Sequence, residues 1–137
     1  MVMKMRAGIT GIAVFMMLTW IITDPAFGQD TEINNVRLAI KTGSSKELSK
    51  FFSDNVELHF DGDRASYSKS QAEFVLRDFF KKYPPVDFQY VHQGNSGEGL
   101  KYAIGKYVIG NGSYRIWLLF KKLNNTYYVD TIDFTRE

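Results

Sequence analysis

Hydrophobic and polar positions over residues 113–134 follow the pattern of two long strands joined by a tight turn at the Asn-Asn pair 124–125. On the second strand the apolar positions change parity between Val129 and Ile132. One extra residue near Asp130 restores the alternation and keeps one continuous apolar face. The pattern therefore predicts a β-bulge and a strongly curved sheet built around this hairpin.

The segment before the first predicted strand favours helices. Residues 32–41 carry apolar side chains at helical spacing, and Gly43 is placed as a C-terminal stop. Ser44 followed by Glu47 is a capping box that opens a second, short helix.

A hairpin and a long helix come next. Residues 56–61 alternate as a half-buried strand, and residues 64–67 form its short return strand. Ser68 with Gln71 makes another capping box, and the helix that it opens ends before Pro84. An apolar stripe along this helix, predicted to face the core, consists of Ala72, Val75, Leu76, Phe79 and Tyr83.

Two further strands connect the long helix to the central hairpin. Residues 86–93 alternate, with one face formed by Phe88, Tyr90 and His92. Residues 94–99 are expected to form a loop, and residues 100–109 the next strand, in which Gly105 is predicted as a bulge residue. The fold class is therefore α+β, with a mainly antiparallel sheet of a hairpin and a four-strand meander.

Several short motifs accompany this succession of elements: His92-Gln93-Gly94, Tyr102-Ala103-Ile104-Gly105-Lys106-Tyr107, Gly112-Ser113-Tyr114-Arg115 and Ile132-Asp133-Phe134. In these motifs the chain resembles an exported bacterial family of unknown function within the nuclear transport factor 2-like (cystatin-like) superfamily. The resemblance implies a sheet wrapped into a cone around the long helix, often with a pocket at the open end, and often a dimer. It supports the fold far better than any activity.

The N-terminus has the layout of a signal peptide over residues 1–28. Lys4 and Arg6 precede an uncharged run over residues 7–22, and the small-residue pattern 26–28 places cleavage before Gln29. A membrane anchor is the alternative, but the run is shorter than the roughly 20 residues that a span needs. We expect a periplasmic or secreted bacterial protein with no stable membrane anchor.

Composition limits what the remaining single domain, residues 29–137, is able to do. The chain has no cysteine, which excludes disulfides, thiolate metal sites and a cysteine nucleophile. Its net charge of +2 comes without a clustered positive face, so no nucleic-acid partner is predicted. No cofactor is predicted either.

Four side chains are candidates for a pocket: His92, Tyr90, Tyr67 and Asp130. Proton transfer would need an acid or base and a hydrogen-bond donor that converge. Because no catalytic motif is present, we favour a non-catalytic domain that binds a small apolar or amphipathic molecule or a protein partner. The alternatives are a small cofactor-free isomerase or dehydratase and a purely structural interaction module.

His59 alternates with Asp61, and Asp63 follows in the turn, so a weak cation site is conceivable. A solvated strand face is the preferred interpretation, and no metal site is predicted.

The first strand of the central hairpin is apolar on both faces, which is unusual for an antiparallel sheet covered on one side. On the face away from the core, the aromatic and aliphatic residues have charged neighbours, and Tyr128 lies on the adjacent strand. The predicted surface for a homodimer consists of Trp117, Leu119, Arg115 and Tyr128. Alternatively, this face is covered within one chain or forms the ligand pocket.

Overall fold

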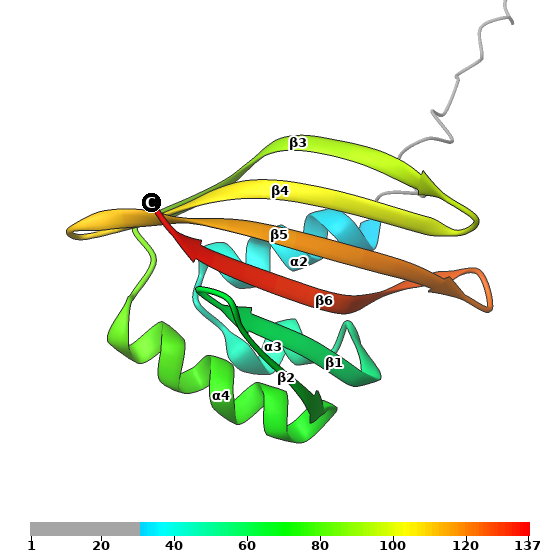
Figure 1. Cartoon of the computed structure of the whole chain (residues 1–137), viewed down its shortest axis with the longest axis horizontal. Coiled ribbons are helices and arrows are strands. Elements are labelled where there is room, and N and C mark those ends of the chain that lie inside the picture. The colour runs from blue at the N-terminus through cyan, green and yellow to red at the C-terminus, as the bar shows by residue number, and fades with distance from the viewer. Residues whose placement is uncertain (1–30) are drawn as a thin grey trace, which may run out of the picture.

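The computed structural model describes residues 31–137, and the predicted signal peptide with its cleavage before Gln29 lies outside this part. In chain order the elements are α2 (Thr31–Lys41), α3 (Ser45–Ser49), β1 (Phe52–Phe60), β2 (Asp63–Ser68), α4 (Lys69–Lys82), β3 (Asp87–Gly97), β4 (Leu100–Ile109), β5 (Gly112–Leu123) and β6 (Thr126–Arg136). In Figure 1, α2 and α3 lie behind the sheet and α4 lies below it.

The helix ends follow the predicted capping residues. Gly43, with φ of 68°, comes shortly after the end of α2. At α4 both halves of the capping box form: the Gln71 N–H donates to Ser68 Oγ at 3.3 Å, and the Ser68 N–H donates to Gln71 Oε1 at 3.1 Å. At α3 only the Ser44 half forms, because the Glu47 carboxylate pairs with Lys50 instead.

The six strands form one open sheet in the order β2-β1-β6-β5-β4-β3. Neighbours run antiparallel except for β1 and β6, which are parallel. The predicted loop over residues 94–99 is wrong, because β3 continues to Gly97 and only a tight turn at Glu98 and Gly99 remains. The predicted α+β class with a mainly antiparallel sheet is confirmed.

The central hairpin forms in the predicted register. Asn124 and Asn125 have φ of 51° and 67°, as a two-residue hairpin turn requires, and Phe120 pairs with Val129. The register then shifts by one residue, which leaves Asp130 as the extra residue of a β-bulge. The prediction of a bulge at this place is confirmed.

The predicted bulge at Gly105 is wrong. β4 pairs with β5 without a register shift along its whole length. The irregularity is on β3, where Tyr90 pairs with Gly105 but His92 pairs with Ile104, so Val91 is the extra residue. This bulge moves His92 to the opposite face from Tyr90, and the prediction that both share one face is also wrong.

Two glycines allow aromatic rings to lie flat across the β3–β4 pair. A Cβ at Gly105 would lie 2.5 Å from the ring of Phe88, and a Cβ at Gly94 would lie 2.7 Å from the Tyr102 hydroxyl. Gly105 therefore serves the close approach of a buried ring rather than a bulge.

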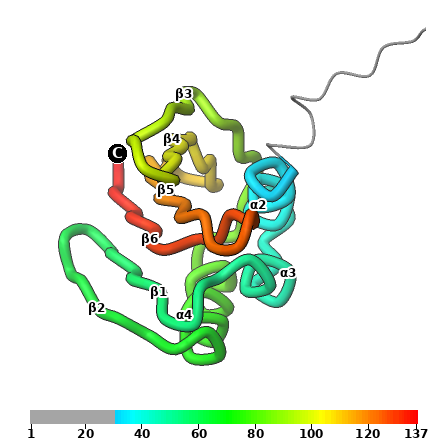
Figure 2. The backbone as a smooth tube through the Cα atoms, turned by 90° about the vertical axis from the view of Figure 1, so that its right-hand side faces the viewer, coloured from blue at the N-terminus to red at the C-terminus, as the bar shows by residue number. Residues whose placement is uncertain are grey.

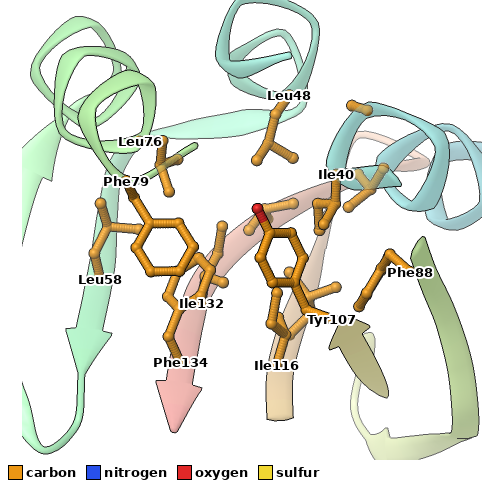
Figure 3. Packing of buried hydrophobic residues seen from close by; sticks show 14 of the residues in the cluster. Ile40, Leu48, Leu58, Leu76, Phe79, Phe88, Tyr107, Ile116, Ile132 and Phe134 are labelled. Carbon is orange, nitrogen blue, oxygen red and sulfur yellow. The ribbon is translucent and has the colours of Figure 1, made fainter. Parts of the chain in front are cut away.

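Helices α2, α3 and α4 pack against one face of the sheet, which we call the inner face (Figures 1 and 2). Figure 3 shows Phe79 of α4, Leu48 of α3 and Ile40 of α2 meeting the strand residues. The predicted stripe on α4 is confirmed, since its residues are buried or pack on the core, whereas Phe74 is 62% exposed. Large side chains fill the space between helices and sheet: Phe52, Phe88, Tyr107, Phe120 and Phe134.

Candidate functional site

A cleft of about 370 Å³ opens between α4 and the end of the sheet where β1 finishes and β5 begins. Four aromatic rings line it, from β1, α4, the residue after α4 and β5: Phe60, Phe79, Tyr83 and Tyr114. Val75 of α4 completes the apolar lining, and the polar residues that line the cleft are Asp61, Asp78 and Lys82.

The rings of the cleft form a continuous cluster. The Phe79 centroid lies 5.4 Å from that of Phe60, 5.3 Å from that of Tyr83 and 5.2 Å from that of Tyr114. Phe134 stacks on Phe60 at 4.8 Å and connects the cluster to the core. Contacts on several sides hold these rings in place, so the apolar wall of the cleft is preformed.

Arg136 extends the polar part of the site. Its guanidinium carbon lies 5.3 Å from the ring centroid of Tyr114 and 5.9 Å from that of Tyr83, while Nη2 donates to the Asn111 carbonyl at 3.3 Å. Gly112 leaves room for it, because a Cβ there would lie 3.0 Å from Nη2.

The hydroxyl of Tyr114 stays neutral over a wide pH range. Burial raises the pKa of this group, and hydrogen bonding to the Arg136 guanidinium partly opposes the rise. The cleft therefore presents a neutral phenol beside a guanidinium, which is chemistry suited to holding an oxygen-bearing group.

The four candidate pocket residues lie outside this cleft and do not meet. The Tyr90 hydroxyl donates to the Ile33 carbonyl at 2.7 Å, and burial raises the pKa of that hydroxyl. Tyr67 packs on the core from β2. His92 Nε2 lies 2.7 Å from the Tyr102 hydroxyl on the exposed side of β3.

The last candidate, Asp130, forms an ion pair with Lys121 at 3.8 Å and accepts a hydrogen bond from the Thr131 hydroxyl. Lys121 alternates with the buried Phe120, so this pair lies on the sheet face away from the helices, which we call the outer face.

The expectation that His59 belongs to a solvated strand face is wrong, because the residue is only 8% exposed. Its Nε2 lies 2.8 Å from Glu57 Oε1, and its Nδ1 lies 3.2 Å from Asp133 Oδ2. Strands on both sides of β1 and these two carboxylates enclose the ring. Within residues 31–137, no group of three or more His, Asp or Glu is placed to hold a metal ion.

The predicted dimer residues of β5 lie on the outer face. Trp117 and Leu119 are half-buried, and the side chain of Arg115 is 53% exposed. Tyr128 pairs with Lys121 across the hairpin and is also half-buried.

An open six-stranded sheet with its helices on one face is the nuclear transport factor 2-like architecture. The chain is similar in fold to an NTF2-like protein of unknown function from Shewanella baltica, with a TM-score of 0.63, 11% identity, and coverage of 85% of this chain and 98% of that chain. Because the identity is low, this likeness shows the fold alone.

The chain belongs to the family described as a domain of unknown function, DUF4783, whose pattern matches residues 33–135. It is similar to a family member from Bacteroides ovatus, with 33% identity, a TM-score of 0.72, and coverage of 75% of this chain and 93% of that chain. A member from Bacteroides uniformis has 29% identity, a TM-score of 0.72, and coverage of 76% and 95%. No protein of curated function matches. The family of unknown function expected from the motifs is thereby confirmed, and the chain has the nuclear transport factor 2-like fold.

Sequence reasoning missed the cleft because its residues are far apart in the chain. Tyr83 belongs to the predicted core stripe of α4, and both Tyr83 and Tyr114 do pack on the core. Tyr83 and Tyr114 come together at one end of the sheet because of the way α4 packs across β1 in the folded protein. The available indication was that Phe60 ends β1 and Tyr83 directly follows α4.

Proposed function

We propose that this chain is an exported, non-catalytic binding domain that holds a small amphipathic molecule in the cleft between α4 and the sheet. The observation that carries the proposal is the cluster of four aromatic rings at the cleft, with charged residues beside it. A ligand site of this kind combines an apolar wall with a few polar groups that fix orientation.

The volume and charge of the cleft narrow the ligand. About 370 Å³ is near the lower end of the 300 to 1,000 Å³ typical of ligand sites, which favours a small molecule. Within the described residues, neither Lys82 nor Arg136 forms an ion pair with a carboxylate. Because Asp61 and Asp78 also line the cleft beside Lys82, the cleft offers both cations and carboxylates to the polar end of a ligand, and curvature of the sheet around α4 would shape the apolar part.

Fluorescence titration with anilinonaphthalene sulfonate, an aromatic amphipathic anion, tests the cleft. Val75→Trp should fill it and weaken dye binding at least about tenfold, which corresponds to about 1.4 kcal/mol. The control is Leu38→Trp, which adds the same ring beside the separate surface pocket between α2 and α3. Equal affinity of wild type and Val75→Trp would contradict the cleft as the binding site.

The alternative, a cofactor-free isomerase or dehydratase, would need a base facing a hydrogen-bond donor inside the site. Tyr114 and Arg136 are donors, but of the two carboxylates that line the cleft Asp61 already accepts the backbone N–H of Arg136 at 2.7 Å, and within the described residues Asp78 forms no hydrogen bond with either donor. This arrangement supports binding over proton transfer.

Export is proposed from the sequence of residues 1–28 alone. No helix in the described residues is long and apolar enough to cross a membrane. The intact mass of protein recovered outside the cytoplasm should correspond to a chain beginning at Gln29, and recovery with the hydrophobic run retained would reject cleavage.

We also propose that the domain pairs with a second copy through the outer face. Trp117 and Leu119 are half-buried there, none of the helices α2, α3 and α4 of the described residues lies over them, and Arg115 flanks them. The mature protein should sediment as a dimer at micromolar concentration, and Trp117→Glu should make it monomeric. A dimer that survives this substitution would reject the surface.

A further inference from the structure

One face of α4 forms the helical wall of the cleft and carries both apolar and charged side chains. At the i, i+3, i+4 spacing of a single helix face, with the last residue directly after the helix, lie Val75, Asp78, Phe79, Lys82 and Tyr83. Phe79 is only 7% exposed and lies at the floor of the cleft, whereas Asp78 and Lys82 are exposed at its mouth. A molecule in the cleft therefore places its apolar part on aromatic rings and its polar part between a carboxylate and an ammonium group.

The two helix charges at the mouth are available to a ligand. Within residues 31–137, the side chains of Asp78 and Lys82 form no hydrogen bond and no ion pair. They are four residues apart, which separates their positions by about 6 Å along the helix axis. Opposite charges at this spacing on an exposed helix face attract each other only weakly, so a ligand that contacts both does not have to break a strong ion pair.

The sheet side of the cleft has the same balance of charge. Asp61 follows β1, and its Oδ1 accepts the backbone N–H of Arg136 at 2.7 Å. The Arg136 guanidinium lies over the ring of Tyr114, and within the described residues it forms no ion pair with a carboxylate. Each wall therefore brings one positive and one negative group to the cleft. A net anion bound there would lie beside two carboxylates, and a net cation would lie beside two basic groups.

We propose that the ligand of the cleft is a small zwitterion, with an ammonium and an anionic group at one end of an apolar body, as in an α-amino acid with an apolar side chain. This inference rests on the binding function proposed above and specifies the class of ligand. Both charges of the ligand are at the same end, because Asp78 and Lys82 are both at the mouth while the rings lie deeper. The cleft volume of about 370 Å³ suits one such molecule.

The order of residues along α4 sets the orientation of the ligand. Its ammonium contacts Asp78, and its anionic group contacts Lys82, one turn closer to the C-terminal end of the helix. Tyr83 follows Lys82, and its ring centroid lies 5.9 Å from the guanidinium carbon of Arg136. The two basic groups are therefore on the side of the cleft that receives the anionic group, and the apolar side chain of the ligand packs on Phe79.

An NMR titration of the mature protein, followed at individual backbone amides, tests the class of ligand with three related probes. L-phenylalanine carries both charges, N-acetyl-L-phenylalanine keeps only the carboxylate, and L-phenylalanine amide keeps only the ammonium. Near pH 6 the free amino groups are protonated, because the ordinary pKa of an α-amino group is about 7.7 to 8.0. Phenylalanine should bind at least about threefold more tightly than either derivative, since each derivative loses one of two charged contacts.

Two substitutions assign the contacts. Asp78→Asn should weaken phenylalanine binding at least about threefold but should not weaken binding of the N-acetyl derivative, because only the ammonium contacts Asp78. Lys82→Met should weaken phenylalanine binding to a similar extent but should not weaken binding of the amide. The matched controls are Asp54→Asn, at an exposed position of β1, and Lys81→Met, next to Lys82 but outside the cleft lining, and both should bind all three probes like wild type.

Each other outcome has a definite meaning. A derivative that binds as tightly as phenylalanine would show that the ligand class is not zwitterionic, and phenylalanine binding unaffected by Asp78→Asn and Lys82→Met would reject the two contacts. If no probe shifts the cleft amides while anilinonaphthalene sulfonate still binds there, this inference is overturned but the ligand site is kept. Equal dye affinity of wild type and Val75→Trp would overturn the ligand site and this inference with it.

Discussion

The inner and outer faces of β5 are built from alternate residues of one strand, yet their surroundings differ. Ile116 on the inner face is fully buried under the helices, whereas its neighbour Trp117 on the outer face is only half-buried. The inner face gains stability from rings that pack on every side. The outer face instead carries the half-buried Trp117 and Leu119 with the charged Arg115 beside them, an apolar centre with a charged edge.

This difference shows why an apolar residue on a strand does not by itself indicate core. Both faces of β5 carry large apolar side chains, but only the inner face has complementary surfaces from α2, α3 and α4. Stability and recognition are therefore expected to respond to different substitutions in this small domain.

The largest effect is expected at the inner side of α4. Phe79→Ala should lower the free energy of unfolding by roughly 3 to 5 kcal/mol, because it opens a cavity among several rings. Phe74→Ala on the solvent side should cost below about 1 kcal/mol, mainly through its contact with Arg77. Equal losses of the free energy of unfolding for the two variants in denaturant melts would contradict the distinction between the buried and the exposed side of α4.

Close packing on the inner face is also expected to make Gly105 intolerant of a side chain. Gly105→Ala should cost about 1 to 3 kcal/mol, since the new Cβ would meet the Phe88 ring at 2.5 Å and the Gln89 carbonyl at 2.9 Å. Gly110→Ala, where nothing lies within 4 Å of the new Cβ, should change stability by about 0.5 kcal/mol or less. Identical chemical-denaturation curves for both variants would contradict this packing.

High pH should lower the free energy of unfolding, because buried tyrosines of the inner face then lose protons on unfolding. Burial raises the pKa values of Tyr90 and Tyr107 well above 10.0, so the folded state keeps protons that the unfolded state releases. The contribution of these two tyrosines to the free energy of unfolding is therefore fully present below pH 10. Above pH 10 the free energy of unfolding falls by up to about 1.4 kcal/mol per pH unit for each tyrosine. Tyr90→Phe should flatten the decline in the free energy of unfolding, and an unchanged slope would contradict the assignment.

The smallest effect is expected at the outer face of the isolated monomer. At concentrations below the dimer dissociation constant, Trp117→Ala should cost about 1 kcal/mol, because one side of the ring already faces solvent. Thermal melts of dilute protein measure this cost. A loss as large as that of Phe79→Ala would mean that Trp117 belongs to the core and that the outer face is not an open surface.

The two bulges show what a single sequence is able to reveal. The bulge at Asp130 was predicted because apolar residues on both sides of it change parity, which leaves a visible trace in the pattern. The bulge at Val91 was missed because the residues after it, from His92 onward, are polar and exposed, so a slip by one residue changes no burial pattern. Gly105 drew the prediction to the wrong strand, although it is needed to make room for Phe88.

By itself, the sequence determined the order of the helices and strands, the α+β class, the register of the central hairpin and the buried stripe of α4, because periodicity, capping and turn residues act over short distances along the chain. Only the tertiary structure decided the parallel pairing of β1 with β6, which encloses His59 between Glu57 and Asp133. It also decided the cleft, whose rings come from elements far apart in the chain. Contacts of that kind depend on how the sheet and α4 are placed in space, and no local pattern of residues records that placement.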